Sequence, residues 1–349
     1  MPKFLWKHII DSLTIDHFIK MTITDREFMT VTTYDSIKCC VMANIKGNII
    51  IVKCKADRIN IFWIYTWHHH ICYDSISDAL NAVGSDKTKL IYYKILIKPK
   101  HYTFDVACYW FLNKQCNIEM SGLCDGHSNI PIITGTIQRR KYFYISQCFS
   151  MNNIVFKNID IHFNTSVYES HINIFNCTFS NGSNLEIDCI VTAKISQCRF
   201  DKSDLNLGMN GCYINNNKPD DNDLIKMNYD IISNVFININ TGCIAFCGDY
   251  HRSSIFNISS NTVLDCKLLC KIYMEYVSIY FTDNVFTNMI SCIESYSNYA
   301  FVVFENNTFT NVKSLCIDNA VDIVKMSSNN TFTNCDNELI RYIEQSNNT

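Results

Sequence analysis

The sequence has few of the residues and patterns that mark several common protein classes. Its 349 residues include only 10 glycines and 4 prolines. The 30 lysines and arginines are balanced by 33 acidic residues, which argues against the basic surface of a nucleic-acid-binding protein. No run of 18 apolar residues predicts a membrane span, and the N-terminus lacks the apolar core of a signal peptide. We therefore expect a cytoplasmic protein that binds neither nucleic acid nor membrane.

The cysteines also lack the spacing of a known metal site. There are 19 of them, spread along the chain without a Cys-x-x-Cys pair or a Cys/His zinc pattern. Many stand beside Phe, Ile or Val, so we expect small buried thiols rather than disulfides. His68, His69 and His70 are consecutive, and in a strand they would point to alternate sides and not converge on one ion. No metal or cofactor is expected.

A repeat of about 23 residues is the strongest feature that is present. A short Asn-x-Phe motif or its variant recurs between residues 156 and 332. The last residue of the motif falls at Phe156, Phe179, Phe200, Phe236, Val263, Phe286, Phe309 and Phe332, at spacings of 23, 21, 36, 27, 23, 23 and 23 residues. The longest interval contains the polar segment 212–226, which we expect to loop out of an otherwise regular coil.

The segments around each motif alternate apolar and polar residues, which is the periodicity of strands. One coil of this length cannot bury its own inward face, but coils stacked about 4.8 Å apart can. We therefore predict an all-β solenoid, a right-handed parallel β-helix of about eight to ten coils, with its regular repeats in residues 141–349. Asparagines should stack at the turns, in a ladder that comprises Asn234, Asn261, Asn284, Asn307 and Asn330.

Residues 74–102 combine an amphipathic helix with a strand that ends at a proline. Ser75 or Ser77 can cap the helix, and Gly84 can end it. This segment resembles the start of pectate-lyase-like β-helices, in which a short helix covers the open N-terminal end of the stack. The matching positions are Ile76, Ala79, Leu80, Ala82, Ile95, Ile97, Pro99 and Tyr102, whereas Lys100 replaces the family's glycine. The resemblance assigns residues 46–140 to a linker, the capping helix and the first coils.

Residues 2–28 have apolar residues at helical spacing and form a separate unit. Their pattern resembles the F-box at Pro2, Leu5, Ile9, Leu13, Asp16, Phe18, Ile23 and Phe28. Thr24-Asp25-Arg26 stands where the family has a Cys-Lys/Arg element, and Met1 replaces the initial leucine. The resemblance implies a small helical head over residues 1–45.

An F-box joined to a β-helix, in an AT-rich composition suited to a large DNA virus, resembles a class of ubiquitin-ligase adaptors. This resemblance implies a non-enzymatic substrate-recognition adaptor of an SCF-type ligase, with the β-helix binding a target protein. The head would bind Skp1, within a cullin-type ligase core, through Pro2, Leu5, Ile9, Leu13, Phe18 and Ile23. Two alternatives stay open: a carbohydrate-binding or carbohydrate-cleaving β-helix protein, and a purely structural interaction module.

A sugar-cleaving enzyme would need carboxylates at equal positions on successive coils. Asp201 and Asp204 follow the motif at Phe200, but the positions equivalent to Asp201 are Ser180, Ile237 and Thr287. Asp283 and Glu305 are one coil apart and offset by one residue, as expected of exposed turn charges. The acidic cluster Asp220, Asp221 and Asp223 falls in the polar insert, where a solvated loop is expected. We expect no catalytic residues, and we expect the tyrosines at 273, 276, 280, 296 and 299 to pack in ladders.

Overall fold

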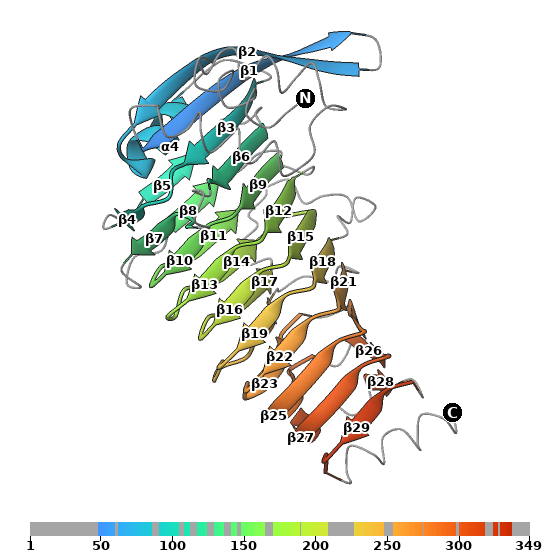
Figure 1. Cartoon of the computed structure of the whole chain (residues 1–349). Helices are drawn as coiled ribbons and strands as arrows, with labels where there is room; N and C mark the ends of the chain where they lie inside the picture. The colour runs from blue at the N-terminus through green and yellow to red at the C-terminus, as the bar shows by residue number, and fades with distance from the viewer. Residues whose placement is uncertain are drawn as a thin grey trace, which may run out of the picture.

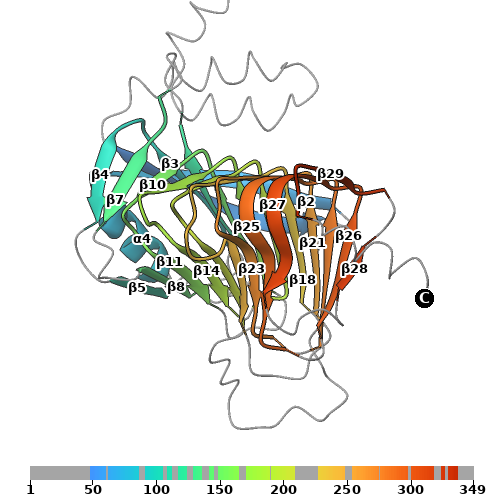
Figure 2. The same ribbon diagram turned by 90° about the horizontal axis from the view of Figure 1, so that it is seen from below.

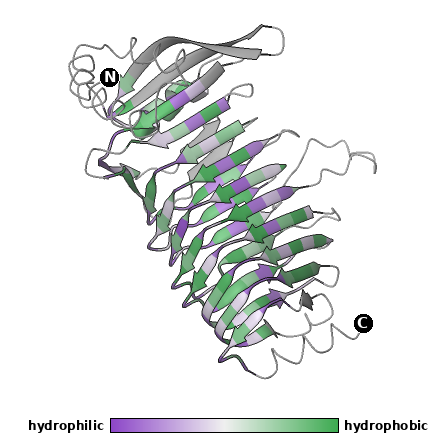
Figure 3. Cartoon of the chain, turned by 45° about the vertical axis from the view of Figure 1, so that its right-hand side comes forward, coloured by the Kyte–Doolittle hydropathy of each residue, from purple (hydrophilic) through white to green (hydrophobic). Residues whose placement is uncertain are grey.

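The computed structural model shows a parallel β-solenoid with one helix (Figure 1). It describes residues 48–59, 62–85, 91–104, 108–111, 117–123, 129–135, 141–144, 148–164, 170–188, 190–208, 227–247, 254–274, 276–297, 300–317, 324–326 and 329–336. Hydrophilic and hydrophobic residues alternate along most strands (Figure 3), as expected where one face of each strand is buried.

Each coil contributes strands to three faces. The first face contains β3 (Ile91–Ile97), β6 (Asn117–Gly122), β9 (Cys148–Asn152), β12 (His171–Phe175), β15 (Thr192–Ser196), β18 (Asn228–Ile232), β21 (Ser254–Ser259), β24 (Val277–Thr282), β26 (Phe301–Glu305) and β28 (Val324–Met326). The second contains β4 (His101–Phe104), β7 (Ile132–Gly135), β10 (Val155–Lys157), β13 (Thr178–Ser180), β16 (Arg199–Asp201), β19 (Val235–Ile237), β22 (Thr262–Leu264) and β29 (Thr331–Thr333). The third contains β5 (Cys108–Phe111), β8 (Lys141–Tyr144), β11 (Ile161–Asn164), β14 (Leu185–Asp188), β17 (Leu205–Gly208), β20 (Ile244–Cys247) and β23 (Leu268–Ile272).

About seven turns have three separate strands, and they run from β3 to β23. In the coils that follow, the second and third faces merge into single long strands, β25 (Val285–Ser295) and β27 (Thr308–Ile317). β25 pairs with both β22 and β23, and Figure 2 shows β25 and β27 as continuous bent ribbons. The predicted solenoid is therefore confirmed with about seven such turns, while its right-handed sense stays a prediction.

The predicted motif residues form one column inside the second face. Phe156, Phe179, Phe200, Phe236, Val263, Phe286, Phe309 and Phe332 are paired in register on successive coils. Neighbouring rings stack with centroids 4.9–5.3 Å apart, as in the pairs Phe156–Phe179 and Phe309–Phe332. The 36-residue interval does not disturb this register, because β16 pairs directly with β19 and β17 with β20. The extra residues therefore fall between Gly208 and Met227.

The predicted asparagine ladder (Asn234, Asn261, Asn284, Asn307 and Asn330) is present and buried. In a typical step, Asn284 Nδ2 donates to Asn307 Oδ1 at 3.0 Å and to the carbonyl of Ile258 at 2.8 Å. Its Oδ1 accepts from the backbone and side-chain nitrogens of Asn261 at 2.8 and 3.0 Å. In each inner asparagine of the ladder the side-chain nitrogen donates and the side-chain oxygen accepts hydrogen bonds, so these buried amides are satisfied. In earlier coils Cys198, Cys177 and Ile154 take the same position, since Asn234 Oδ1 accepts from Cys198 N at 2.8 Å.

The left-handed residues of the corners are not the ladder asparagines. They are the residues immediately before the ladder position, such as Ser260, Asp283 and Asn306, with φ near 55°. A second series of left-handed residues, including Asn288 and Asn311, marks the corner between the second and third faces. The outward residue adopts the strained angle, because the inward asparagine must keep an extended backbone to hold its amide along the stack.

The N-terminal end of the stack is covered by elements of another kind. α4 (Ile76–Ser85) packs against β1 and β5 and buries Ile76, Ala79, Leu80 and Val83 in the core. Ser75 is its cap, with Asp78 N donating to Ser75 Oγ at 3.3 Å. A long antiparallel hairpin, β1 (Ile49–Ile59) and β2 (Phe62–Tyr73), extends the first face through β3 (Figure 1). The capping helix is confirmed, whereas the hairpin was not predicted.

The predicted head, residues 1–45, lies outside the described residues, and so does the insert 212–226. Cys177 and Cys198 are buried thiols, as predicted for cysteines beside apolar residues. Among the described residues, no helix has the length and apolar character that a membrane span requires.

The asparagine ladder predicts a large effect of one buried amide on stability. Asn284→Ala removes four hydrogen bonds and leaves the neighbouring buried groups unsatisfied, so the free energy of unfolding should fall by about 2–4 kcal/mol. Urea denaturation followed by circular dichroism measures this. The matched control is Asn173→Ala on the outer side of β12, where the residue is exposed and the change should be within about 0.5 kcal/mol. Equal stabilities of the two variants would contradict the role given to the ladder.

Candidate functional site

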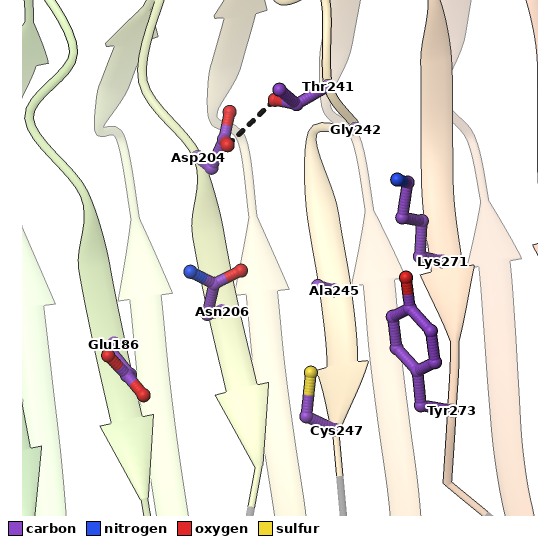
Figure 4. A pocket seen from close by; sticks show the side chains of 9 residues that line it. All are labelled: Glu186, Asp204, Asn206, Thr241, Gly242, Ala245, Cys247, Lys271 and Tyr273. Carbon is purple, nitrogen blue, oxygen red and sulfur yellow. Dashed lines mark hydrogen bonds between the residues drawn. The ribbon is translucent and has the colours of Figure 1, made fainter.

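A groove of about 330 Å³ lies on the outside of the third face, across β14, β17, β20 and β23 (Figure 4). It is lined by Glu186, Asp204, Asn206, Thr241, Gly242, Ala245, Cys247, Lys271 and Tyr273. The register pairs Asn206 with Ala245 and Ala245 with Lys271, so these side chains form one row across neighbouring coils. The small side chain of Ala245 leaves the hollow between its two larger neighbours. We refer to these residues as the groove.

The backbone is tightly packed beneath one edge of the groove. A Cβ atom added at Gly208 would lie 2.3 Å from the carbonyl oxygen of Cys247 on the next coil. Any residue other than glycine at position 208 would collide with the backbone of Cys247. Gly208 is also the residue paired with Asp188, so no side chain on β17 lies beside Asp188. Asp188 and Cys247 are consequently neighbours across Gly208 on the outer side of the sheet, where Asp188 is buried. Burial, together with the nearby Asp188 and Glu186 carboxylates, raises the pKa of the Cys247 thiol to about 11.

Asp204 is the acid at the rim of the groove. Its Oδ2 accepts a hydrogen bond from Thr241 Oγ1 at 2.7 Å. Burial raises the pKa of this carboxyl, the Thr241 hydrogen bond and the charge of Lys271 oppose the rise, and Asp160 adds to it. Asp204 is thus a carboxyl that holds its proton to a higher pH than a solvated aspartate does.

Two tyrosines continue the groove toward the C-terminal coils. Tyr273 and Tyr296 stack with ring centroids 4.8 Å apart and planes 5° apart. Tyr296 is 62% exposed, and its hydroxyl donates to Glu294 Oε1 at 2.6 Å. Glu294 also lies 3.6 Å from Lys271, which connects the tyrosine pair to the row in the groove. The predicted tyrosine ladder is therefore partly present, as an exposed pair on the surface.

A second group of ionisable side chains adjoins the groove at Glu186. The acid–histidine cluster consists of His162 on β11 and Glu186 and Asp188 on β14. His162 Nε2 lies 2.8 Å from Asp188 Oδ2, and His162 Nδ1 lies 3.9 Å from Glu186 Oε2. The side chains of His162, Glu186 and Asp188 are only 9, 15 and 2% exposed, although all three project from the outer side of the sheet.

The candidate site residues predicted from the sequence do not come together in one site among the described residues. The proposed Skp1-binding residues and the acidic cluster of the insert lie outside the described residues. Asp201 pairs with Ser180 and Ile237, as predicted, so no carboxylates stack at that position. Asp283 and Glu305 are exposed at a corner and offset by one residue. Sequence reasoning missed the His162, Glu186 and Asp188 cluster.

The fold and the groove define a parallel β-solenoid protein with a polar, partly aromatic outer surface. Neither a protein-family model, nor a curated protein, nor a solved structure matches this chain. Its function is therefore argued from its own residues.

Because the pKa of Asp204 is raised, replacing this residue with a neutral one should stabilise the fold, by an amount that depends on pH. The folded state holds the Asp204 proton more tightly than the unfolded state, so ionisation destabilises the fold as the pH rises from the unfolded value of 3.8 through the folded pKa. Asp204→Asn should therefore be more stable than wild type at pH 7, with a difference that vanishes in acid. Thermal unfolding measured from pH 3 to pH 8 tests this. Thr241→Val removes a hydrogen bond that lowers the pKa of Asp204, so the loss of stability caused by Asp204 ionisation should occur at higher pH. An Asp204→Asn protein that is less stable than wild type at pH 7 would contradict the raised pKa of Asp204.

Proposed function

We propose that the protein is a non-enzymatic substrate-recognition adaptor of an SCF-type ubiquitin ligase. Residues 1–45 would bind Skp1, and the solenoid would bind a target protein at the groove and the tyrosine pair. The mechanism is proximity, because a bound target is held near the ubiquitin-transferring enzyme at high effective concentration. The adaptor needs no catalytic residue of its own.

The observation that carries the proposal is the composition of the outer third face. Exposed Tyr273 and Tyr296 are stacked and therefore pre-ordered, and they lie beside Lys271 and the carboxylates of the groove. Tyrosines with a charged rim are typical of protein-binding surfaces, where aromatic residues contribute most of the binding energy. The groove, at about 330 Å³, has room for one or two side chains of a partner and is at the small end of ligand pockets.

The spacing of the two binding regions also favours an adaptor. The chain enters the solenoid at Ile49, in the hairpin that pairs with the first coil. The groove lies three to six coils further along, which is about 14–29 Å at 4.8 Å per coil. A rigid stack between a head and a target site holds the target at a fixed distance from the point where the head is attached. Skp1 is proposed as the partner of the head because residues 2–28 resemble the F-box.

The Skp1 contact is tested with the full chain. Wild type should bind purified Skp1, and Leu5→Asp/Ile9→Asp should abolish binding, because burying unpaired charges in an apolar contact costs several kcal/mol. The matched control is Lys7→Asp, which adds negative charge on the opposite side of the predicted helix and should retain binding. Biolayer interferometry measures all three. Failure of the wild type to bind would remove the adaptor role.

The target surface is tested by separate variants. Lys271→Glu/Tyr273→Ala should retain Skp1 binding and lose the target proteins whose ubiquitylation depends on the intact head, as measured by quantitative diGly proteomics. The control is Lys194→Glu/Phe175→Ala, a matched change on the exposed outer side of the first face, which should retain the targets. Loss of the same targets with both double variants would show that the groove is not the specific surface.

Carbohydrate binding or cleavage is the second candidate, and one observation favours it. Asp204 is a carboxyl with a raised pKa beside a row of polar groups and a stacked tyrosine pair, an arrangement that suits a sugar ring and a general acid. Glycan-array binding and reducing-end assays with the wild type and Asp204→Asn distinguish it. Sugar binding that requires Tyr296 would support this candidate, and absence of both sugar and Skp1 binding would leave a structural module.

A further inference from the structure

We propose that His162, Glu186 and Asp188 form a binding site for a divalent transition-metal ion, with Zn²⁺ as the representative ion. One ligand atom from each of the three side chains lies within 4.8 Å of the other two. The proposal does not depend on the function of the groove or of the N-terminal residues.

The geometry of the histidine and the aspartate fits two adjacent ligands of one ion. His162 Nε2 and Asp188 Oδ2 are 2.8 Å apart. Nitrogen and oxygen ligands lie about 2.1 Å from Zn²⁺, so tetrahedral ligands lie about 3.4 Å from each other. Opening this pair by about 0.6 Å would replace the shared hydrogen bond with a bridging ion. The adjustment is within the range of ordinary side-chain torsions.

Glu186 is placed to be the third ligand, and it lies where an ion would enter the site from the groove. His162 and Glu186 are paired in register on β11 and β14, and Asp188 follows two residues later on the same side of the strand. Glu186 is the most exposed of the three and also lines the groove, so its carboxylate can turn from His162 Nδ1 toward the ion. Three protein ligands leave the fourth position of a tetrahedral ion for a water, as in zinc sites that retain one.

The donor set selects the class of ion. Ca²⁺ and Mg²⁺ prefer oxygen ligands alone, whereas an imidazole with two carboxylates suits Zn²⁺, Mn²⁺ or Fe²⁺. All three side chains lie in a wall from which water is largely excluded. Asp188 is 2% exposed and is paired with Gly208 on the next coil.

The experiment measures metal stoichiometry on the full chain. Protein freed of metal by a chelator is dialysed against Zn²⁺, and bound zinc is counted by plasma mass spectrometry. Wild type should bind one Zn²⁺ more per chain than His162→Ala and than Glu186→Gln. His171→Ala, at an exposed histidine on β12, is the matched control and should bind as much as wild type. Glu186→Gln changes a partly exposed residue, so the test stands even where His162→Ala fails to fold.

A second readout separates this site from zinc bound by any of the 19 cysteines, whose thiolates are also zinc ligands in general. Co²⁺ bound by His162 and the two carboxylates should give weak visible bands without the near-ultraviolet charge transfer of a cobalt–thiolate bond. These bands should be lost in Glu186→Gln and retained in His171→Ala. Equal zinc content in wild type and Glu186→Gln, or only thiolate-type cobalt spectra, would overturn the proposal and leave the cluster as an ion pair.

Discussion

In-register stacking of successive coils is the constraint on which the rest of the structure depends. Each inward residue has its equivalents directly above and below it at about 4.8 Å, so it must be compatible with copies of itself. Phenylalanine meets this condition by stacking, as Phe179 and Phe200 do at 5.0 Å. Asparagine meets it because one amide donates in one direction and accepts from the other. An aspartate at Asn284 would place like charges and acceptors against each other, which explains why the ladder consists of amides.

The amides of the ladder all point the same way along the stack, from Asn234 toward Asn330. Such aligned hydrogen bonds polarise one another, and in a buried corner they have no water to compete with. The ladder therefore fixes the corner between the first and second faces in every coil that has an asparagine there. In the earlier coils Ile154 fills the same position by packing, whereas the thiols of Cys177 and Cys198 donate to the backbone carbonyls of Phe175 and Ile174 at 3.5 and 3.7 Å. The inward side chains therefore stabilise the fold, and only the outward side chains are available for binding.

The phenylalanine and asparagine columns and the capping helix could be predicted, because each depends on local periodicity counted from one motif. The acid–histidine cluster could not. The third-face strands begin at Ile161, Leu185, Leu205 and Ile244 in one register, but these residues lie five, six, five and eight positions after their motif residues. The corner between the second and third faces therefore varies in length, and an alignment on the motif misplaces the third face. The hairpin was missed for a different reason, since its antiparallel strands do not belong to the repeat.

This variation also explains where a binding site can arise on a solenoid. From Val263 onward the motif recurs every 23 residues, and from β25 onward the second and third faces merge into continuous strands. Identical coils present identical outer columns, and a column of like charges is destabilised by repulsion between neighbours. A site that combines histidine, carboxylates, lysine and tyrosine needs coils that differ from one another. The groove and the acid–histidine cluster lie between β11 and β23, in the coils of unequal length, where irregular corners allow unlike side chains to become neighbours.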